Sequence, residues 1–321
     1  MNKSPCRGLV ISLDFELFWG VTDSRSLSGY RDHVAGEWQA IPTMLALFEQ
    51  YEIKATWATV GMLMCRDYAD WRERRPALLP NYERSGCSNY LWDDSVRENP
   101  DLFFGRPLVD KILQVAGQEL ATHTYSHFFC GEAGVTTEQF TSDLICAQSQ
   151  AKELGFRFKS LVFPRNQVRT EFLNVLPDVG ISVYRGNPGH LLYRDGHFVP
   201  GGLAGRAVRF ADTWLPLTGS LVSRPFVDKG LVNVPASFFL RPWSRHFSAF
   251  ERMRMFRMKR IMTEAAIEDS LCHIWWHPHN FGINTDRNLA VLEELLKHFC
   301  YLRDKYGMES RSMDDFAGVA T

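Results

Sequence analysis

The chain reads Glu119-Leu120-Ala121-Thr122-His123-Thr124-Tyr125-Ser126-His127 near its middle, where a strand-like run leads directly into two histidines four residues apart. Two imidazoles at this spacing, at a strand end or on the first turn of a helix, can converge on one cation. Neutral imidazole is a common ligand of zinc and of neighbouring transition metals. Isolated pairs of this kind are often surface or capping histidines, so a metal site requires other reactive residues at the same place in the fold.

Strand-like and helix-like segments alternate on both sides of this stretch. The predicted strands are 9–13, 54–60, 119–122, 160–163, 181–184, 232–239 and 273–276, and the predicted helices are 36–51, 107–116, 136–154, 170–176, 247–266 and 285–306. This alternation is typical of a parallel sheet, and about seven strand–helix units suit a closed or nearly closed barrel better than a small doubly wound sheet. We therefore predict an α/β barrel in a single domain, residues 1–321, with irregular insertions at about 65–105 and 190–225.

Composition narrows the possible functions. The 321 residues carry a net charge of −1, which does not suggest a general nucleic-acid binder. The seven cysteines are scattered and contain no CxxC, which favours free thiols in a reducing compartment. The apolar run 8–13 is too short for the core of a signal peptide or for a membrane span. We expect a soluble, cytoplasmic protein without a membrane span.

Reactive side chains follow four of the predicted strands. They are Asp14 and Glu16 after the first strand, His123 and His127 after the third, Arg165 and Asn166 after the fourth, and His277 and His279 after the last. In a parallel barrel, functional groups collect where the strands end. Residues two apart on an extended segment also face the same way, so the first and last pairs can each point into one cavity.

Each of these residues also has a purely structural interpretation. Asp14 could cap a helix or loop, and Glu16 could simply be solvated. Arg165 could bind a structural carboxylate, and His279 could serve merely to hydrogen-bond the loop at Asn280. Four reactive groups on one rim are nevertheless much less expected by chance than any single one of them.

Four segments resemble motifs of the polysaccharide deacetylases, the family 4 carbohydrate esterases that include the nodulation chitooligosaccharide deacetylases. They are similar to the first, second, third and fifth motifs of that family, in the same order: Ile11–Glu16, His123–His127, Phe163–Asn166 and Ile274–His277. The resemblance spans about residues 8–282. It implies a distorted (β/α) barrel and metal-dependent removal of an N- or O-acyl group from a sugar.

The sequence departs from the family pattern at three places. The usual adjacent Asp-Asp is replaced by Asp14-Phe15-Glu16, and the usual Arg-x-Pro-Tyr is replaced by Pro164-Arg165-Asn166-Gln167. The fourth motif, Asp-x-x-Asp-Trp, has only a faint counterpart in Asp212-Thr213-Trp214. The first departure leaves the expected base and metal ligand two residues apart, and the second leaves Arg165 as the candidate for the family's base-orienting arginine.

The resemblance implies roles for individual residues. A divalent metal ion, expected to be zinc, would be held by Glu16, His123 and His127. Asp14 would act as general base and His277 as general acid, with Arg165 keeping Asp14 ionised and oriented. We expect four further residues to contact the substrate, namely Tyr125, Asn166, Trp92 and His279. The aromatic insertion around Trp92 suits stacking on sugar faces, and core packing is its structural alternative.

The expected substrate is an acylated sugar or glycan, nucleotide-linked or lipid-linked, used to make surface polysaccharide. Two alternatives are an amidohydrolase that acts on a small non-sugar amide or ureide, and a catalytically inactive carbohydrate-binding homologue. The segment 251–262 mixes arginine with methionine and could touch a membrane surface. An outer barrel helix with a charged face is the simpler interpretation, since a methionine stripe usually fills a core.

Overall fold

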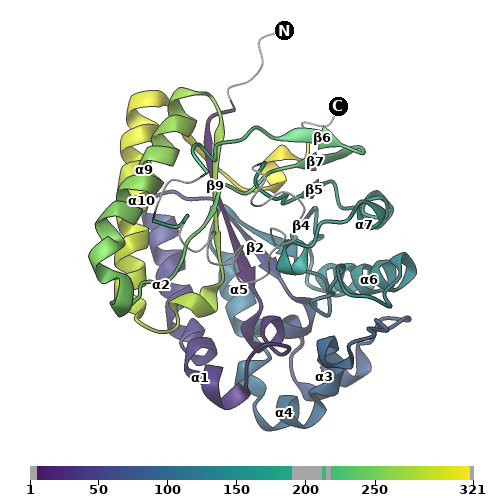
Figure 1. The fold of residues 1–321 in the computed structure, drawn as a ribbon. Helices are drawn as coiled ribbons and strands as arrows, with labels where there is room; N and C mark the ends of the chain where they lie inside the picture. The colour runs from purple at the N-terminus through teal and green to yellow at the C-terminus, as the bar shows by residue number, and fades with distance from the viewer. Residues whose placement is uncertain (1–5, 190–211, 215–217, 319–321) are drawn as a thin grey trace.

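The computed structural model describes residues 6–189, 212–214 and 218–318, and its centre is one curled, mostly parallel sheet (Figure 1). The strands are β1 (Gly8–Phe15), β2 (Ala55–Thr59), β3 (Gln118–Thr122), β4 (Ser160–Leu161), β5 (Val183–Tyr184), β6 (Phe226–Asp228), β7 (Leu231–Asn233), β8 (Phe238–Phe239), β9 (Leu271–Trp276) and β10 (Glu309–Arg311). Their order is β6-β7-β5-β4-β3-β2-β1-β9-β8, and β10 pairs with β1. Only the pairing of β6 with β7 is antiparallel among these strands. The predicted α/β fold, a distorted barrel, is confirmed.

The expected strand over 232–239 is interrupted in the structure. Its first part is β7, which pairs with β5, and its last part is β8, which pairs with β9. Val234 N–H donates to the Tyr184 carbonyl at 2.9 Å, and Ser237 N–H donates to the His273 carbonyl at 2.8 Å. Pro235 lies between them and has no N–H to donate, which explains the break. The kinked segment therefore connects the β5 side of the sheet to the β9 side.

Helices cover the outside of the sheet. They are α1 (Leu27–Ala35), α2 (Glu37–Gln50), α3 (Tyr68–Glu73), α4 (Asp93–Glu98), α5 (Arg106–Gln114), α6 (Thr137–Glu153), α7 (Thr170–Leu173), α9 (Glu251–Ile267) and α10 (Thr285–Tyr306). The short 3-10 helices are η1 (Leu17–Gly20), η2 (Gly61–Met64), η3 (Ser85–Cys87), η4 (Asn89–Leu91), η5 (Pro100–Leu102), η6 (Pro164–Asn166), η7 (Pro177–Val179), η8 (Arg245–Phe250), η9 (Pro278–Phe281) and η10 (Asp314–Phe316). Figure 1 shows α9 and α10 side by side on one flank of the sheet.

Sequence signals explain where several helices begin and end. Thr136 and Gln139 form a capping box at the start of α6, in which each side chain accepts from the other residue's backbone N–H. Pro107 lies in the first turn of α5, where its missing N–H costs nothing. Gly307 ends α10 with a φ of 69°, a left-handed conformation that glycine adopts without strain.

The two faces of β1 pack differently, and this difference positions the candidate site. All of β1 is buried. Ile11 and Leu13 belong to the large core that includes α2 and α10. Val10 packs instead with Val183 and Val232 in a smaller cluster made mostly of strand residues, which fills the inside of the barrel. Because side chains alternate along a strand, Asp14 lies on the same inner face as Val10.

The first predicted insertion, at about 65–105, contains α3, α4 and three of the 3-10 helices. Its large side chains Trp71 and Phe103 are fully buried and join the main core. The second, at about 190–225, falls largely outside the described residues. In the described part of the chain, no helix is both long and apolar enough to cross a membrane.

Candidate active site

Asp14 and Glu16 lie at the carboxyl end of β1 and point into the mouth of the barrel. Asp14 is the next-to-last residue of the strand, and Glu16 follows it at the start of η1. Both carboxylates are almost completely buried, with 3% and 2% of the residue exposed. Buried carboxylates require charged or hydrogen-bonding partners, and both residues have them.

Glu16 meets both histidines of the sequence motif. Its Oε1 lies 2.9 Å from His123 Nε2 and 3.2 Å from His127 Nε2. Burial alone would raise the pKa of Glu16, but the neighbouring histidines His277, His127 and His123 together hold it well below its usual range. The predicted ligands Glu16, His123 and His127 are therefore brought together as one buried cluster.

The tautomer of His123 indicates that this cluster suits a cation. His123 Nδ1 lies 2.8 Å from the Val162 carbonyl, which can only accept, so Nδ1 carries the proton. The Nε2 atom of the neutral ring then presents a lone pair to the Glu16 carboxylate. His127 Nδ1 is buried and has no hydrogen-bond partner among the described residues. Lone pairs that converge at such distances repel each other unless a proton or a metal ion lies between them, so the donor set fits a divalent ion.

The turn that carries the two histidines is held from α6. Thr124 and His127 have positive φ angles of 65° and 55°, so the backbone is tightly turned. The Asp143 carboxylate accepts from Tyr125 N–H at 2.6 Å and from Ser126 N–H at 3.1 Å, and it also accepts from the Ser126 hydroxyl. Asp143 is itself fully buried. This carboxylate fixes the turn and with it the directions of both imidazoles.

Asp14 is paired with Arg185, which follows β5. The guanidinium donates to both carboxylate oxygens, at 2.7 Å and 2.8 Å, and also to Ser12 Oγ and Asn166 Oδ1 at 2.9 Å each. It also lies over the Trp275 ring, 4.4 Å from its centroid. Burial, the largest single effect, would raise the pKa of Asp14, but the charge and hydrogen bonds of Arg185 together with the charges of His123 and His277 lower it overall. Asp14 is thus held ionised and in one orientation.

His277 approaches the two carboxylates from β9. Its Nε2 lies 3.8 Å from Asp14 Oδ2 and 3.7 Å from Glu16 Oε1. The ring of His279 stacks on it, with centroids 4.8 Å apart and planes 18° apart. His279 is only 3% exposed, and burial lowers its pKa to about 3, with the His277 charge as the next cause. His277 is therefore the histidine that remains accessible in the cavity.

Three expected site residues are placed elsewhere than the sequence indicated. Arg165, expected beside Asp14, forms ion pairs with Asp23 and Glu132 and lies over the Phe129 ring. Its φ of 56° is a left-handed backbone conformation.

Tyr125 is fully buried, and its hydroxyl donates to the Arg74 carbonyl at 2.7 Å, so it packs in the core and does not line the cavity. Trp92 packs edge-to-face against Phe18, partly buried against the core. Asn166 lies near the site but contacts Arg185, so it supports the arginine that orients Asp14.

Several residues of the site were missed by the sequence analysis. Arg185 directly follows the predicted strand 181–184, which is the signal that picked out the other rim residues. Ser12 and His273 lie within strands and form a hydrogen bond of 2.8 Å beneath the Arg185–Asp14 pair. Nothing in the local sequence distinguishes them from ordinary strand residues. No local sequence signal marks Asp143 in α6 either, because its role depends on hydrogen bonds from the backbone of Tyr125 and Ser126.

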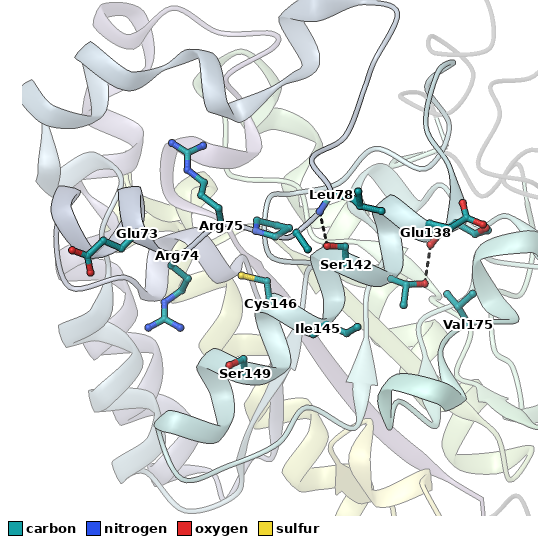
Figure 2. A pocket seen from close by; sticks show the side chains of 14 residues that line it. Glu73, Arg74, Arg75, Leu78, Glu138, Ser142, Ile145, Cys146, Ser149 and Val175 are labelled. Atoms are coloured by element: carbon teal, nitrogen blue, oxygen red, sulfur yellow. Dashed lines mark hydrogen bonds between the residues drawn. The ribbon is translucent and has the colours of Figure 1, made fainter.

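A separate pocket with a volume of about 640 Å³ lies between residues 73–78 and α6. Figure 2 shows Leu78, whose backbone N–H donates to the Ser142 hydroxyl, on one side of it. Its lining is mostly apolar and includes none of the expected site residues. The reactive groups therefore gather at the barrel rim and not in this pocket.

Comparison with known proteins shows similarity through structure alone. No family model matches the chain, and no curated protein matches its sequence. A structure from Mycobacterium smegmatis, assigned as a polysaccharide deacetylase, aligns over 100% of this chain and 92% of its own, with a TM-score of 0.61 and 13% identity.

Two further structures share the fold. PuuE allantoinase aligns over 97% of this chain and 88% of its own, with a TM-score of 0.52 and 14% identity. A GH57-type branching enzyme from Pyrococcus horikoshii aligns over 97% of this chain and 69% of its own, with a TM-score of 0.54 and 11% identity. At these identities the likeness concerns the fold, and the expected resemblance to polysaccharide deacetylases is confirmed at that level.

Proposed function

We propose that the protein is a metal-dependent hydrolase that removes an N- or O-acyl group, most simply acetyl, from a sugar or glycan precursor of surface polysaccharide. One observation carries the proposal: a buried Glu16–His123–His127 cluster lies beside an Asp14 carboxylate that Arg185 holds ionised. His277 lies within 3.8 Å of both carboxylates. A ligand set, a base and an acid at one rim are the requirements of acyl-group hydrolysis.

The residues divide the chemistry between them. Glu16, His123 and His127 would hold a divalent ion, with zinc the best match to two imidazoles and one carboxylate. When bound, such an ion lowers the pKa of water and polarises a carbonyl. Asp14 takes a proton from the attacking water, since Arg185 keeps it ionised and its Oδ2 lies 3.8 Å from His277 Nε2. His277 gives a proton to the departing amine or alcohol.

A small amide or ureide is the second candidate substrate. It is favoured by the structural likeness to PuuE allantoinase, whose name indicates activity on a non-sugar ureide. The same base, acid and ligand set would serve either substrate. The third possibility is a homologue that binds carbohydrate without turnover.

The deciding experiment measures release of acetate or formate from a panel of acylated nucleotide-sugars and oligosaccharides, with and without added divalent metal. Allantoin is included as a separate arm with ureide hydrolysis as its readout. We expect metal-dependent release from at least one acylated sugar, abolished by His277→Ala. Turnover of allantoin alone would move the assignment to the second candidate. No turnover, with carbohydrate binding retained, would support the third.

A further inference from the structure

The start of α9 flanks the mouth of the candidate site. β8 runs parallel to β9, so Phe239 ends at the rim where His277 lies, and their ring centroids are 5.8 Å apart. From β8 the chain continues through η8 directly into α9. The first turns of α9 therefore lie on the catalytic side of the barrel, and its last turn lies toward the opposite side.

Much of the arginine and methionine in α9 belongs to the interior. Arg254 and Arg257 are only 2% and 8% exposed, and each is paired with a carboxylate. Met255 and Met258 are buried in the main core. Met255 and Met258 therefore fill the core, as the simpler interpretation of the sequence expected. Any surface function of α9 must depend on its exposed residues.

Those remaining residues form an apolar stripe. Phe256 is 70% exposed, Phe250 is 49% exposed and Met253 is 38% exposed. Their spacing of three residues places them along one side of the helix. A single exposed apolar side chain needs no explanation, but a row of three, including two aromatic rings, is a feature of an interaction surface.

The charge around this stripe is positive. Arg245 in η8 and Arg252 in α9 are exposed, and neither forms an ion pair with another described residue. The two carboxylates of α9, Glu251 and Glu264, are each already paired with an arginine. The stripe is therefore flanked by unneutralised guanidinium groups.

We propose that this surface, made of Phe250, Met253 and Phe256 with Arg245 and Arg252, docks onto a bilayer that contains anionic lipid. Aromatic and aliphatic side chains on one helix face, with arginine beside them, suit the headgroup region, where rings insert at the acyl boundary and guanidinium groups meet phosphate. Such docking would turn the mouth of the barrel toward the membrane surface. If the proposed function holds, the site could then take a lipid-linked sugar.

The test is co-sedimentation of the full chain with vesicles of phosphatidylcholine alone or with added phosphatidylglycerol. We expect binding to the anionic vesicles only, weakening as salt is raised. Arg252→Ala should weaken binding about fivefold, and Phe256→Ser should weaken it about tenfold or more. Ile145→Ser, a matched change at a 57% exposed residue of α6, should leave binding unchanged. Thermal melts check that each variant is folded.

Three results would overturn the proposal. The first is the absence of binding to anionic vesicles by the unsubstituted chain, and the second is equal loss of binding in Phe256→Ser and Ile145→Ser. The third is a dimer in analytical ultracentrifugation that Phe256→Ser converts to monomer without any change in vesicle binding, because the surface would then hold a second copy. Vesicle binding is measured without substrate, so its failure is distinct from failure of the proposed hydrolysis.

Discussion

His277 and His279 are neighbours on one extended segment, but their surroundings give them different tasks. His277 reaches both carboxylates, whereas His279 is buried behind it as a stacking partner. We expect His277→Ala to reduce turnover by about a hundredfold to ten-thousandfold, the usual contribution of a general acid. His279→Ala should cost less. Metal content and folding should survive both changes, and a larger loss from His279→Ala under those conditions would exchange the roles.

Arg185 provides a second prediction at the scale of single residues. Its guanidinium lowers the pKa of Asp14, so its removal should raise that pKa. A base works only when ionised, so the acidic limb of the pH–rate profile should move to higher pH in Arg185→Met. Turnover at neutral pH should fall on the order of a hundredfold.

Arg165→Met is the matched control for this prediction, because Arg165 forms its ion pairs with Asp23 and Glu132. It should leave the acidic limb in place. A shifted limb in Arg165→Met with an unshifted limb in Arg185→Met would return the orienting role to Arg165.

Asp14 and Glu16 can be separated by amide substitutions that preserve shape. Asp14→Asn should retain the metal and lose most turnover, since Asp14 is held by Arg185. Glu16→Gln should lower metal affinity first, since Glu16 contacts both motif histidines. Metal titration and rate measurements on both variants test this. Loss of metal from both variants would make the two carboxylates joint ligands. The structure would permit this, because Asp14, Glu16 and His277 form a second group of side chains that could hold a metal ion.

At the scale of elements, α6 supports the candidate metal ligands without contributing one. Asp143 on this helix accepts from the backbone of Tyr125 and Ser126, between the two histidines. Asp143→Ala leaves those buried donors unpaired, at a cost of about 1–3 kcal/mol for each. We expect a lower melting temperature and a metal affinity reduced by roughly 10- to 100-fold, as for other residues that orient ligands. Lys152→Ala, on an exposed position of the same helix, should change neither property.

The elements also show what local sequence can and cannot specify. The alternation of strands and helices and the capping box at Thr136 depend on neighbouring residues, so they could be predicted. Pro235 marks the break in the expected strand 232–239 locally, but the strands with which the two halves pair are distant in the chain and could not be predicted from it.

The same limit applies to the site. Reactive side chains that end or directly follow a predicted strand could be found from the sequence, and these are Asp14, Glu16, His123, His127 and His277. Arg185 meets the rule as well and was overlooked, while the burial of Tyr125 depends on a carbonyl about fifty positions away.

For the whole molecule, the metal should act as a cross-link as well as a cofactor. Glu16 lies 107 residues from His123 in the sequence, so an ion held between them ties β1 to the end of β3. A ligand that binds only the folded state stabilises it by about 2.7 kcal/mol at one hundred times its dissociation constant. For a chain of 321 residues that corresponds to roughly 4 °C in melting temperature.

We therefore expect about one divalent ion per chain, zinc in preference to others, and a melting temperature that falls when a chelator removes it. His123→Ala and His127→Ala should each lose both the metal and the chelator effect. His277→Ala should keep both, because that histidine is assigned to proton transfer and not to the ion. Elemental analysis and thermal melts provide the measurements. Unchanged metal content in both the His123 and His127 variants would remove the ligand assignment, even if the barrel and its rim remain as described.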